Sequence, residues 1–354
     1  MTYNEALNFI KNKESLGIKP GLVRIKEVLK RLDNPQDSFK TIHIAGTNGK
    51  GTIASTISKA LYDSGLNVGL FTSPWVTEYR EQIQLNGEMI SEGEFADVIE
   101  EISLLNSDCT EFECVTVAAY LFFRNHNVDY AVIECGMGGR DDATNTEKNN
   151  LSVITSIALD HTDFLGSTVA EIAENKAGIL RTNCPCVLYN RELKDIFEDK
   201  CSSLVLCPRK SNLALVNTVL DLLKLKPVKR LVKLPARMEI IGEVMLDGSH
   251  NVSAAKKLAP YLENETAVIA MLKDKDVEGY IKLIAPKCKT IIATAVSHKR
   301  AMPPEVIADI AEDYCDNVLV VDNPADAVNI KNLSLVCGSF YLAREVRKIL
   351  LNNI

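Results

Sequence analysis

The feature that most constrains this fold is the glycine-rich segment GTNGKGT at residues 46–52. It follows an apolar run at residues 41–45 and precedes a helix-like pattern at residues 53–61. A glycine-rich turn between a strand and a helix N-terminus gathers backbone N–H groups and the positive end of the helix dipole around a phosphate. Lys50 adds a full positive charge, and the hydroxyl of Thr52 is placed to bind Mg²⁺. The segment therefore predicts a nucleoside triphosphate site.

The segment departs from the common phosphate-loop pattern G-x-x-x-x-G-K-[ST]. Only two residues separate Gly46 from Gly49, and Gly51 stands between Lys50 and Thr52. The alternative is an ordinary strand-to-helix turn with chance glycines. The order of strand, turn, lysine, hydroxyl and helix favours phosphate binding, because the mechanism needs these parts in that order.

Helix and strand patterns alternate from the segment onward to about residue 226. This pattern predicts an α/β fold, a P-loop-type doubly wound and mainly parallel sheet with helices on both faces. Asn86-Gly87 predicts a hairpin turn, and Ser91 and Thr110 each begin a capping box. Two amphipathic helices are expected before the segment. The expected elements are helices at 3–13, 22–32, 91–105 and 110–125, strands at 67–71, 130–134 and 151–159, and the hairpin at 82–89.

A basic stretch at residues 224–234 contains Pro227 and is followed by Pro235; it reads as a linker, and the alternation restarts beyond it. We therefore expect two domains, an ATP-binding domain at residues 1–233 and a smaller Rossmann-like α/β domain at residues 234–354. The expected strands of the second domain are 244–246, 266–271, 290–293, 317–321 and 333–336, with helices beginning near 252, 275, 304, 324 and 339.

Composition narrows the class of protein. A chain of 354 residues with 46% hydrophobic and 25% charged residues suits two ordinary globular domains. No apolar run approaches the roughly 20 residues that a membrane helix needs, and the polar N-terminus is not a signal peptide. Ten cysteines without a CxxC pair read as reduced thiols of a cytoplasmic protein. A net charge of −7 argues against nucleic acid as a partner but not against small anionic substrates.

Polar side chains stand at the ends of the predicted strands. Ser73 follows one strand, Glu134 ends another, and Asp160 and His161 end a third. Ligands collect at the carboxyl ends of strands in a doubly wound sheet. Together with Thr52, these side chains predict a site for Mg²⁺ bound to ATP, because Mg²⁺ prefers oxygen ligands.

Each of these residues also has an ordinary structural interpretation. Glu134 alone could pair with Arg140, and His161 alone could be a loop histidine with satisfied hydrogen bonds. Lys176 is by default a helix lysine, since a protonated amine cannot bind Mg²⁺. A lysine carbamylated by carbon dioxide could bind it through an anionic oxygen.

The second domain offers a similar turn. Asp247 to Asn251 lies between a predicted strand and a predicted helix, and Arg237 follows the linker. The alternative is a capped helix start with Ser249 or Asn251 as the cap. Two such turns suggest ATP bound by both domains.

These motifs together resemble the Mur ligase superfamily, and within it the folylpolyglutamate synthase/dihydrofolate synthase family. The resemblance covers the chain from its first fifth to its end. The matching stretches are GTNGKGT (46–52), TSPWV (72–76), ECGMGGRDDATN (134–145), LDHTDFLGSTVAEIAENKAGI (159–179), PARME (235–239), DGSHN (247–251), MLKDKD (271–276) and GSFYLAREVR (338–347).

The resemblance implies an ATP-dependent amide ligase that activates a pterin-bearing carboxylate as an acyl phosphate and joins it to L-glutamate. It implies that Ser73 and Glu134 bind one Mg²⁺, and that His161, Glu134 and carbamylated Lys176 bind a second. Catalytic roles then fall to Lys50, Glu134, His161 and Lys176. The implied phosphate contacts are Thr47, Asn48, Gly49, Lys50, Gly51 and Thr52.

The resemblance also assigns the remaining ligand contacts. Arg237, Asp247 and His250 correspond to family residues that contact ATP, and Ser339 corresponds to a position near the glutamate site. Thr110 and Asp142 match positions that contact the pterin. The chemistry suits Asp142, because a carboxylate can accept two hydrogen bonds from the N–H and amino groups of the pterin ring.

The sequence departs from the family pattern in three places. Ala236 and Ser249 replace the usual glycine and alanine, which looks tolerable. The interval from Lys176 to Arg237 is shorter than the family norm and lacks a clear His-Gln element before the asparagine that contacts ATP. Asn217 is the candidate for that asparagine.

Two other functions remain open from the sequence. A peptidoglycan Mur ligase would carry a nucleotide-sugar domain before the phosphate loop, for which 45 residues are too few. A non-catalytic ATP-binding protein of the same fold would not need Ser73, Glu134, His161 and Lys176 together. The partners expected are dihydropteroate or folate and L-glutamate, with no nucleic acid and no membrane, and the chain is expected to be a monomer.

Overall fold

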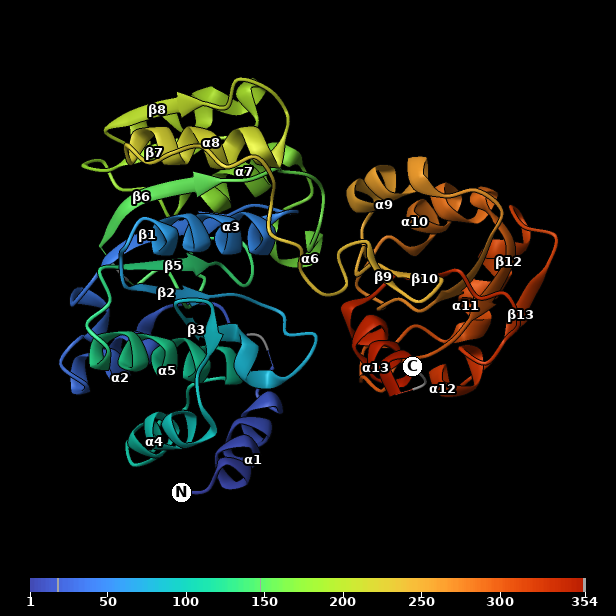
Figure 1. Ribbon diagram of the computed structural model, residues 1–354, viewed down its shortest axis with the longest axis horizontal. Helices are drawn as coiled ribbons and strands as arrows, with labels where there is room; N and C mark the ends of the chain where they lie inside the picture. The colour runs from blue at the N-terminus through green and yellow to red at the C-terminus, as the bar shows by residue number, and fades with distance from the viewer. Residues whose placement is uncertain (18, 147, 353–354) are drawn as a thin grey trace. The chain divides into compact units, whose positions relative to one another are not determined.

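The chain divides into two compact units, seen in a computed structural model that describes residues 1–17, 19–146 and 148–352 (Figure 1). The N-terminal unit comprises Met1–Trp75, Tyr79–Ala158 and Ser167–Val232. The C-terminal unit begins its main part at Lys233 and also contains two short segments, Val76–Glu78 and Leu159–Gly166.

The N-terminal unit is built on an eight-stranded sheet with the order β4-β3-β2-β5-β1-β6-β7-β8. The strands from β2 to β8 in this order are parallel, whereas β3 and β4 pair antiparallel. Their bounds are β1 Lys40–Ala45, β2 Val68–Phe71, β3 Ile83–Leu85, β4 Glu88–Met89, β5 Tyr130–Glu134, β6 Asn149–Ile154, β7 Pro185–Leu188 and β8 Ser203–Leu206. The mainly parallel sheet is therefore confirmed. The hairpin turn is confirmed too, with positive φ at Asn86 and Gly87.

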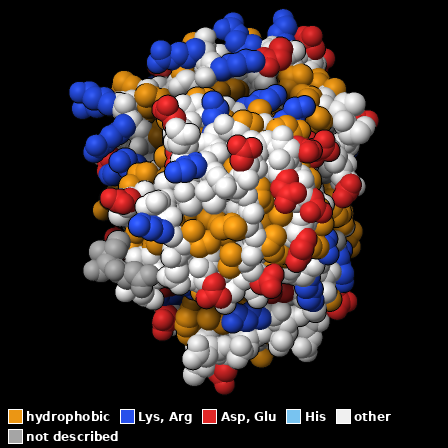
Figure 2. All heavy atoms as spheres, turned by 90° about the vertical axis from the view of Figure 1, so that its right-hand side faces the viewer, with side chains coloured by type: hydrophobic (Ala, Val, Ile, Leu, Met, Phe, Trp, Pro, Cys, Tyr) orange, Lys and Arg blue, Asp and Glu red, His pale blue; other side chains and the backbone are white. Residues whose placement is uncertain are grey.

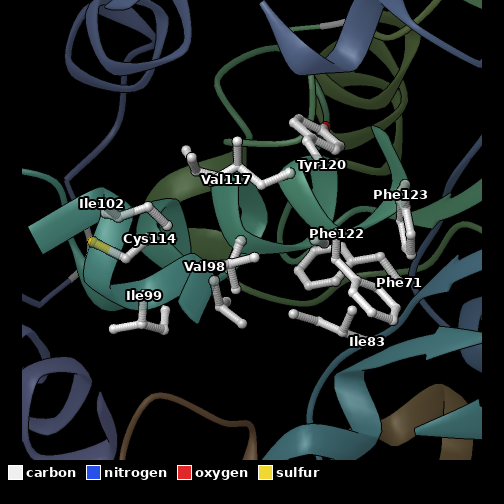
Figure 3. Close-up of a cluster of buried hydrophobic side chains, with 14 of the residues drawn as sticks. Phe71, Ile83, Val98, Ile99, Ile102, Cys114, Val117, Tyr120, Phe122 and Phe123 are labelled. Carbon is white, nitrogen blue, oxygen red and sulfur yellow. The ribbon is translucent and has the colours of Figure 1, made fainter. Parts of the chain in front are cut away.

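Alternate residues of these strands enter two separate cores, because successive side chains of a strand point to opposite faces. On β5, Ala131 and Ile133 belong to one core and Val132 to the other. Figure 3 shows part of the first core, where aromatic side chains of α5 pack near Phe71. The helices are α1 Tyr3–Glu14, α2 Val23–Arg31, α3 Lys50–Asp63, α4 Glu92–Ser103, α5 Glu111–Asn125, α7 Val169–Ala177 and α8 Asn212–Leu222. The doubly wound arrangement is thus confirmed.

Capping boxes in the sequence correctly predict where two of these helices begin. Ser91 accepts a hydrogen bond from the Glu94 N–H at the start of α4, and Thr110 does the same with Glu113 at the start of α5. In both helices, the glutamate carboxylate accepts a hydrogen bond from the backbone N–H of the capping residue. Each predicted capping box is confirmed.

The C-terminal unit contains a six-stranded sheet with the order β13-β12-β11-β14-β10-β9. The strands are β9 Glu239–Ile241, β10 Val244–Leu246, β11 Glu265–Ile269, β12 Cys288–Ala293, β13 Val318–Val320 and β14 Leu335–Cys337. The helices are α6 Thr162–Leu165, α9 Val252–Leu258, α10 Val277–Ile284, α11 Pro304–Glu312, α12 Pro324–Ala327 and α13 Phe340–Asn352. Cores on both faces of this sheet confirm a second α/β unit. Acidic and basic side chains both occur across the face in Figure 2.

Two predicted elements have the wrong bounds, and one strand was not predicted. The strand expected at 151–159 ends at Ile154, because Thr155 and Ser156 turn to hydrogen-bond the glycine-rich segment. Helix α3 begins at Lys50 rather than at residue 53. Strand β9 was not predicted; it pairs antiparallel with β10. Within the described residues, no helix combines the length and apolarity that crossing a membrane requires.

The close contact of β2 with α5 yields a stability prediction. A Cβ added to Gly69 would lie 2.6 Å from Cδ1 of Phe123, which is fully buried. Gly69→Ala should therefore lower the free energy of unfolding of the N-terminal unit by about 1–3 kcal/mol, because the ring must shift in a packed core. Urea unfolding followed by circular dichroism measures this effect.

Gly93→Ala is the matched control. A Cβ at Gly93 meets nothing within 4 Å, and the residue lies in the first turn of α4. This change should be neutral or stabilising by up to about 1 kcal/mol, since alanine favours helix. Equal unfolding midpoints for the two variants would contradict the packing argument.

Candidate functional site

The glycine-rich segment, called the phosphate loop from here on, connects β1 directly to α3. Gly46 has a φ of 150°, and a Cβ there would lie 1.8 Å from Oγ1 of Thr155. Gly49 has a φ of 90° at the N-cap of α3. Only glycine fits these two positions, the first because Thr155 is so close and the second because its backbone is left-handed. The N–H groups in the first turn of α3 have no partner within the helix, as at any helix start.

Residues that follow β6 brace the phosphate loop from the side. The Thr47 N–H donates to the Ser156 carbonyl at 2.8 Å, and Oγ1 of Thr155 donates to the Asn48 carbonyl at 2.9 Å. Oγ1 of Thr47 also bonds both backbone groups of Ala158, at 3.1 Å each. The loop is therefore held in shape by the protein itself.

Two lysines lie on the phosphate loop. Nζ of Lys50 is 3.4 Å from the Thr47 carbonyl, and Nζ of Lys176 donates to the Gly46 carbonyl at 2.9 Å. Lys176 comes from α7 and is almost completely buried. The structure thus brings this residue to the loop, although sequence spacing favoured an ordinary helix lysine.

Glu134 and Ser73 meet the start of α3. Glu134 ends β5, is 2% exposed, and accepts a hydrogen bond on Oε2 from the Ser73 N–H at 3.1 Å. The same oxygen lies 3.2 Å from the position of a Cβ on Gly51. A buried carboxylate therefore stands beside the phosphate loop, next to Thr52, as strand-end placement predicts.

The two residues assigned to the pterin are engaged in other bonds. Thr110 uses its hydroxyl to cap α5. Asp142 is 7% exposed, and its carboxylate accepts hydrogen bonds from the N–H of Met137 at 2.7 Å and from both the N–H and the hydroxyl of Thr144. Burial raises the pKa of Asp142, and these hydrogen bonds oppose that rise.

A buried histidine stands behind this carboxylate. Nε2 of His43, in the middle of β1, lies 2.8 Å from Oγ1 of Thr144 and 3.1 Å from Sγ of Cys135. The side chain has no exposed surface. Burial, with the charge of Arg181, lowers the pKa of His43 to about 3, so it is neutral at physiological pH.

The C-terminal unit gathers a second set of charged residues around Asp160. Its carboxylate accepts hydrogen bonds from Lys275 at 2.6 Å and from Asn251 at 2.8 Å. Nζ of Lys275 also lies 3.2 Å from Nε2 of His161. Burial by itself would raise the pKa of Asp160, but the charges of Lys275, His161 and His250 outweigh it and hold that pKa well below its ordinary value.

Lys275 is the residue of this set to which the sequence analysis gave no role. Its segment, residues 271–276, was named only as one of the stretches that resemble the family. The available signal was a lysine in the turn between strand 266–271 and the following helix, the same context that singled out Asp247.

The other residues predicted in the C-terminal unit surround the turn after β10. Asp247 accepts from the N–H groups of Met238 and Ser249, at 2.9 Å each. Nδ1 of His250 bonds the Gly248 carbonyl at 2.9 Å, and burial, with the charge of Lys275, lowers the pKa of His250 to about 4. The guanidinium of Arg237 lies 3.8 Å from the ring centre of Phe340. Ser339, next to that ring, is buried and accepts from the Tyr341 N–H at 3.1 Å.

Both replacements relative to the family pattern have a local explanation. Ala236 has a φ of 52°, a left-handed conformation that favours glycine, but its methyl group is buried against Val76 and Phe340. Oγ of Ser249 lies 2.8 Å from the hydroxyl of Tyr280, so each buried hydroxyl has a partner.

The structure places Asn217 away from the role proposed for it from sequence. Its amide donates to the Val228 carbonyl at 3.1 Å and accepts from the Val228 N–H at 2.9 Å, which ties α8 to the following segment. Asn212, the first residue of α8, is the asparagine at the phosphate loop. Its Nδ2 lies 2.9 Å from the position of a Cβ on Gly49. Sequence reasoning missed Asn212 because the shortened interval hides where the helix begins.

A metal would need a mixed set of ligands. Within residues 1–17, 19–146 and 148–352, no group of three or more His, Cys, Asp or Glu side chains could hold a metal ion. The set predicted from sequence uses hydroxyls and a modified lysine besides Glu134 and His161. Thr52, Ser73, Glu134 and Lys176 belong to the N-terminal unit, whereas His161 belongs to the C-terminal unit.

Comparison with known proteins identifies the family. The sequence matches the Mur ligase middle domain over residues 44–255 and the Mur ligase, glutamate ligase domain over residues 236–339. It is 34% identical to a probable dihydrofolate synthetase of Schizosaccharomyces pombe, covering 94% of this chain and 99% of the relative. It is 30% identical to the dihydrofolate synthase/folylpolyglutamate synthase of Bacillus subtilis, covering 98% of each chain.

Solved structures agree with this relationship. E. coli FolC in complex with DHPP and ADP superposes with a TM-score of 0.87 at 26% identity, over 100% of this chain and 98% of the other. The Yersinia pestis bifunctional enzyme complexed with AMPPNP and a Mn ion gives a TM-score of 0.86 at 27% identity, over 99% and 98%. The chain belongs to the Mur ligase family, in the branch of the dihydrofolate synthases and folylpolyglutamate synthases.

The buried state of His43 predicts a pH dependence of stability. Its pKa in the folded chain lies below the ordinary value of 6.5, so its contribution to stability is complete above pH 6.5 and is lost as the pH falls toward 3. Between pH 6.5 and 5 this residue alone should cost about 1.5 kcal/mol of unfolding free energy. Urea unfolding of the wild type and of His43→Gln at both pH values should show a steeper loss in the wild type. Equal losses would contradict the assignment of a neutral His43.

Proposed function

We propose that this chain is an ATP-dependent carboxylate–amine ligase that adds L-glutamate to dihydropteroate, to glutamylated folates, or to both. The observation that carries the proposal is the convergence of the phosphate loop, Glu134 and Lys176 at the ends of neighbouring parallel strands. The names of the relatives support the substrate class, and the ligands of the solved structures support a nucleotide and a folate-type substrate.

The reaction needs an activated acid, because a carboxylate is a poor electrophile. Transfer of the γ-phosphoryl group to the carboxylate oxygen forms an acyl phosphate and ADP. The glutamate amine then attacks the carbonyl carbon, phosphate leaves, and the amine loses a proton. Lys50 and the N–H groups at residues 47–52 would hold the triphosphate and offset the repulsion between two anions. Exclusion of water would protect the acyl phosphate from hydrolysis.

A divalent cation fits beside the phosphate loop, next to Glu134. The Mn ion of a solved relative supports a divalent metal in general, and we assign Mg²⁺ here, with two ions. Thr52, Ser73 and Glu134 would hold one, and a buried carboxylate beside the phosphate loop suits that role. Glu134, His161 and carbamylated Lys176 would hold the other. When bound, Mg²⁺ supplies charge screening at the transferred phosphoryl group.

We assign the remaining roles by domain. Residues 1–233 form the ATP-binding domain and residues 234–354 the glutamate-ligase domain. Arg237, Asp247 and His250 would contact ATP, Ser339 would lie near glutamate, and Thr110 and Asp142 would contact the pterin. The enzyme would act as a cytoplasmic monomer on small-molecule substrates.

Product analysis by mass tests the proposed activity. The wild type should join glutamate to dihydropteroate or to tetrahydrofolate, offered separately with ATP and Mg²⁺. Lys50→Ala and Glu134→Ala should lower product formation by at least about 100-fold, because Lys50 places a positive charge at the phosphoryl group and Glu134 would hold the cation that screens it. Both variants should keep the unfolding midpoint of the wild type within a few degrees. Near-normal turnover in either would reject its role, and ATP binding without any pterin-dependent product would favour a non-catalytic protein.

Two asparagines provide a sharper test of the nucleotide site. Asn212→Ala should weaken ADP binding about 10-fold in isothermal titration, the effect of one hydrogen bond to a charged group. Asn217→Ala, in the same helix, should instead lower the unfolding midpoint and leave ADP affinity within about twofold, because its amide bonds only to Val228 among the contacts described here. The reverse pattern would restore Asn217 as the nucleotide contact.

A further inference from the structure

A chain of buried polar side chains runs from β1 to Asp142. Nε2 of His43 contacts Oγ1 of Thr144 at 2.8 Å, and that hydroxyl contacts Oδ1 of Asp142. His43 and Thr144 have no exposed surface, and Asp142 has 7%. Nothing in the catalytic scheme above uses His43 or Thr144. Burial of such groups is costly unless they are hydrogen-bonded, and a satisfied buried network fixes one geometry.

The contacts of this chain follow from the chemistry of its ends. An ionised carboxylate only accepts hydrogen bonds, so the N–H and the hydroxyl of Thr144 both donate to Asp142. His43 meets the same hydroxyl through Nε2, which also lies 3.1 Å from Sγ of Cys135.

Thr144 is itself fixed from three sides. Its N–H donates to Oδ1 of Asp142 at 3.1 Å, its carbonyl accepts from the hydroxyl of Tyr120 at 3.1 Å, and its hydroxyl lies on His43. Tyr120 belongs to α5, where Figure 3 shows it in the first core, and Thr110 caps the start of the same helix. Strand β1 and helix α5 thus meet at one threonine, which faces one carboxylate.

We propose that Thr144, backed by His43, is the positioning residue that aims Asp142 at the pterin ring. The proposal rests on the proposed function, which makes Asp142 a pterin contact. It adds that recognition depends on a side chain that does not touch the substrate. It also places the anchor of that side chain on β1, the strand whose end carries the phosphate loop.

The same geometry limits how many substrate bonds Asp142 can accept. A carboxylate offers about four acceptor positions. The Met137 N–H takes one on Oδ2, and the N–H and hydroxyl of Thr144 take two on Oδ1. One position on Oδ2 remains, so Asp142 accepts one hydrogen bond from a pterin N–H rather than the two that the sequence suggested.

The test compares Thr144→Val, which keeps the shape and removes the hydroxyl, with Thr144→Ser, which keeps the hydroxyl. Dissociation constants for dihydropteroate and for ADP are measured on the full chain by isothermal titration, followed by KM and kcat. Thr144→Val should weaken dihydropteroate binding and raise its KM about 10-fold. Its kcat and ADP affinity should stay within about twofold, and Thr144→Ser should match the wild type.

Each outcome decides a specific point. Unchanged dihydropteroate affinity in Thr144→Val overturns the proposal, and so does a parallel loss of ADP affinity, which would indicate a general structural role. A wild type that binds dihydropteroate with this pattern but forms no product leaves the positioning role standing and rejects the proposed function. A wild type that binds neither dihydropteroate nor tetrahydrofolate, titrated separately, overturns both.

Discussion

The close approach of Gly46 to the end of β6 is the constraint on which the rest of the site depends. Gly46 has no Cβ, so its backbone can approach Thr155 more closely than any other residue would allow. This close approach lets β1 and β6 end side by side with the phosphate loop folded between them. The backbone carbonyls of this loop then point to protein groups, including Lys176 at Gly46 and Thr155 at Asn48. The N–H groups at a helix start form an anion site, and these bonds hold the loop in front of that site in shape.

The parallel order of the strands adds chemistry to this frame. β5 lies next to β1 and ends in Glu134, so a buried carboxylate stands beside Gly51 at the start of α3. A buried charge is costly without a partner, and here the neighbouring N–H of Ser73 offsets part of that cost. In the C-terminal unit, Asp160 is likewise buried, with Lys275 as its charged partner.

Much of this fold could be predicted from sequence because its signals are local. The capping boxes at Ser91 and Thr110, the Asn86-Gly87 turn and the order of the phosphate loop each depend on a few neighbouring residues. What could not be predicted depends on tertiary contacts. Strand β6 stops at Ile154 because the next residues bond a distant loop. Likewise, the spacing of asparagines in α8 does not reveal that Asn212 reaches Gly49 while Asn217 turns to Val228. The turn context of Lys275 was a usable signal, but its contact with Asp160 forms only in the folded unit.

The central claim is that the phosphate loop delivers a phosphoryl group to the carboxylate of a pterin acid. Isotope transfer tests it most directly: dihydropteroate labelled with oxygen-18 in its carboxylate is incubated with the enzyme, ATP, Mg²⁺ and glutamate, and the released phosphate is examined by mass spectrometry. An acyl phosphate predicts that the phosphate carries one labelled oxygen for each amide formed. Amide formed with release of unlabelled phosphate would contradict the account.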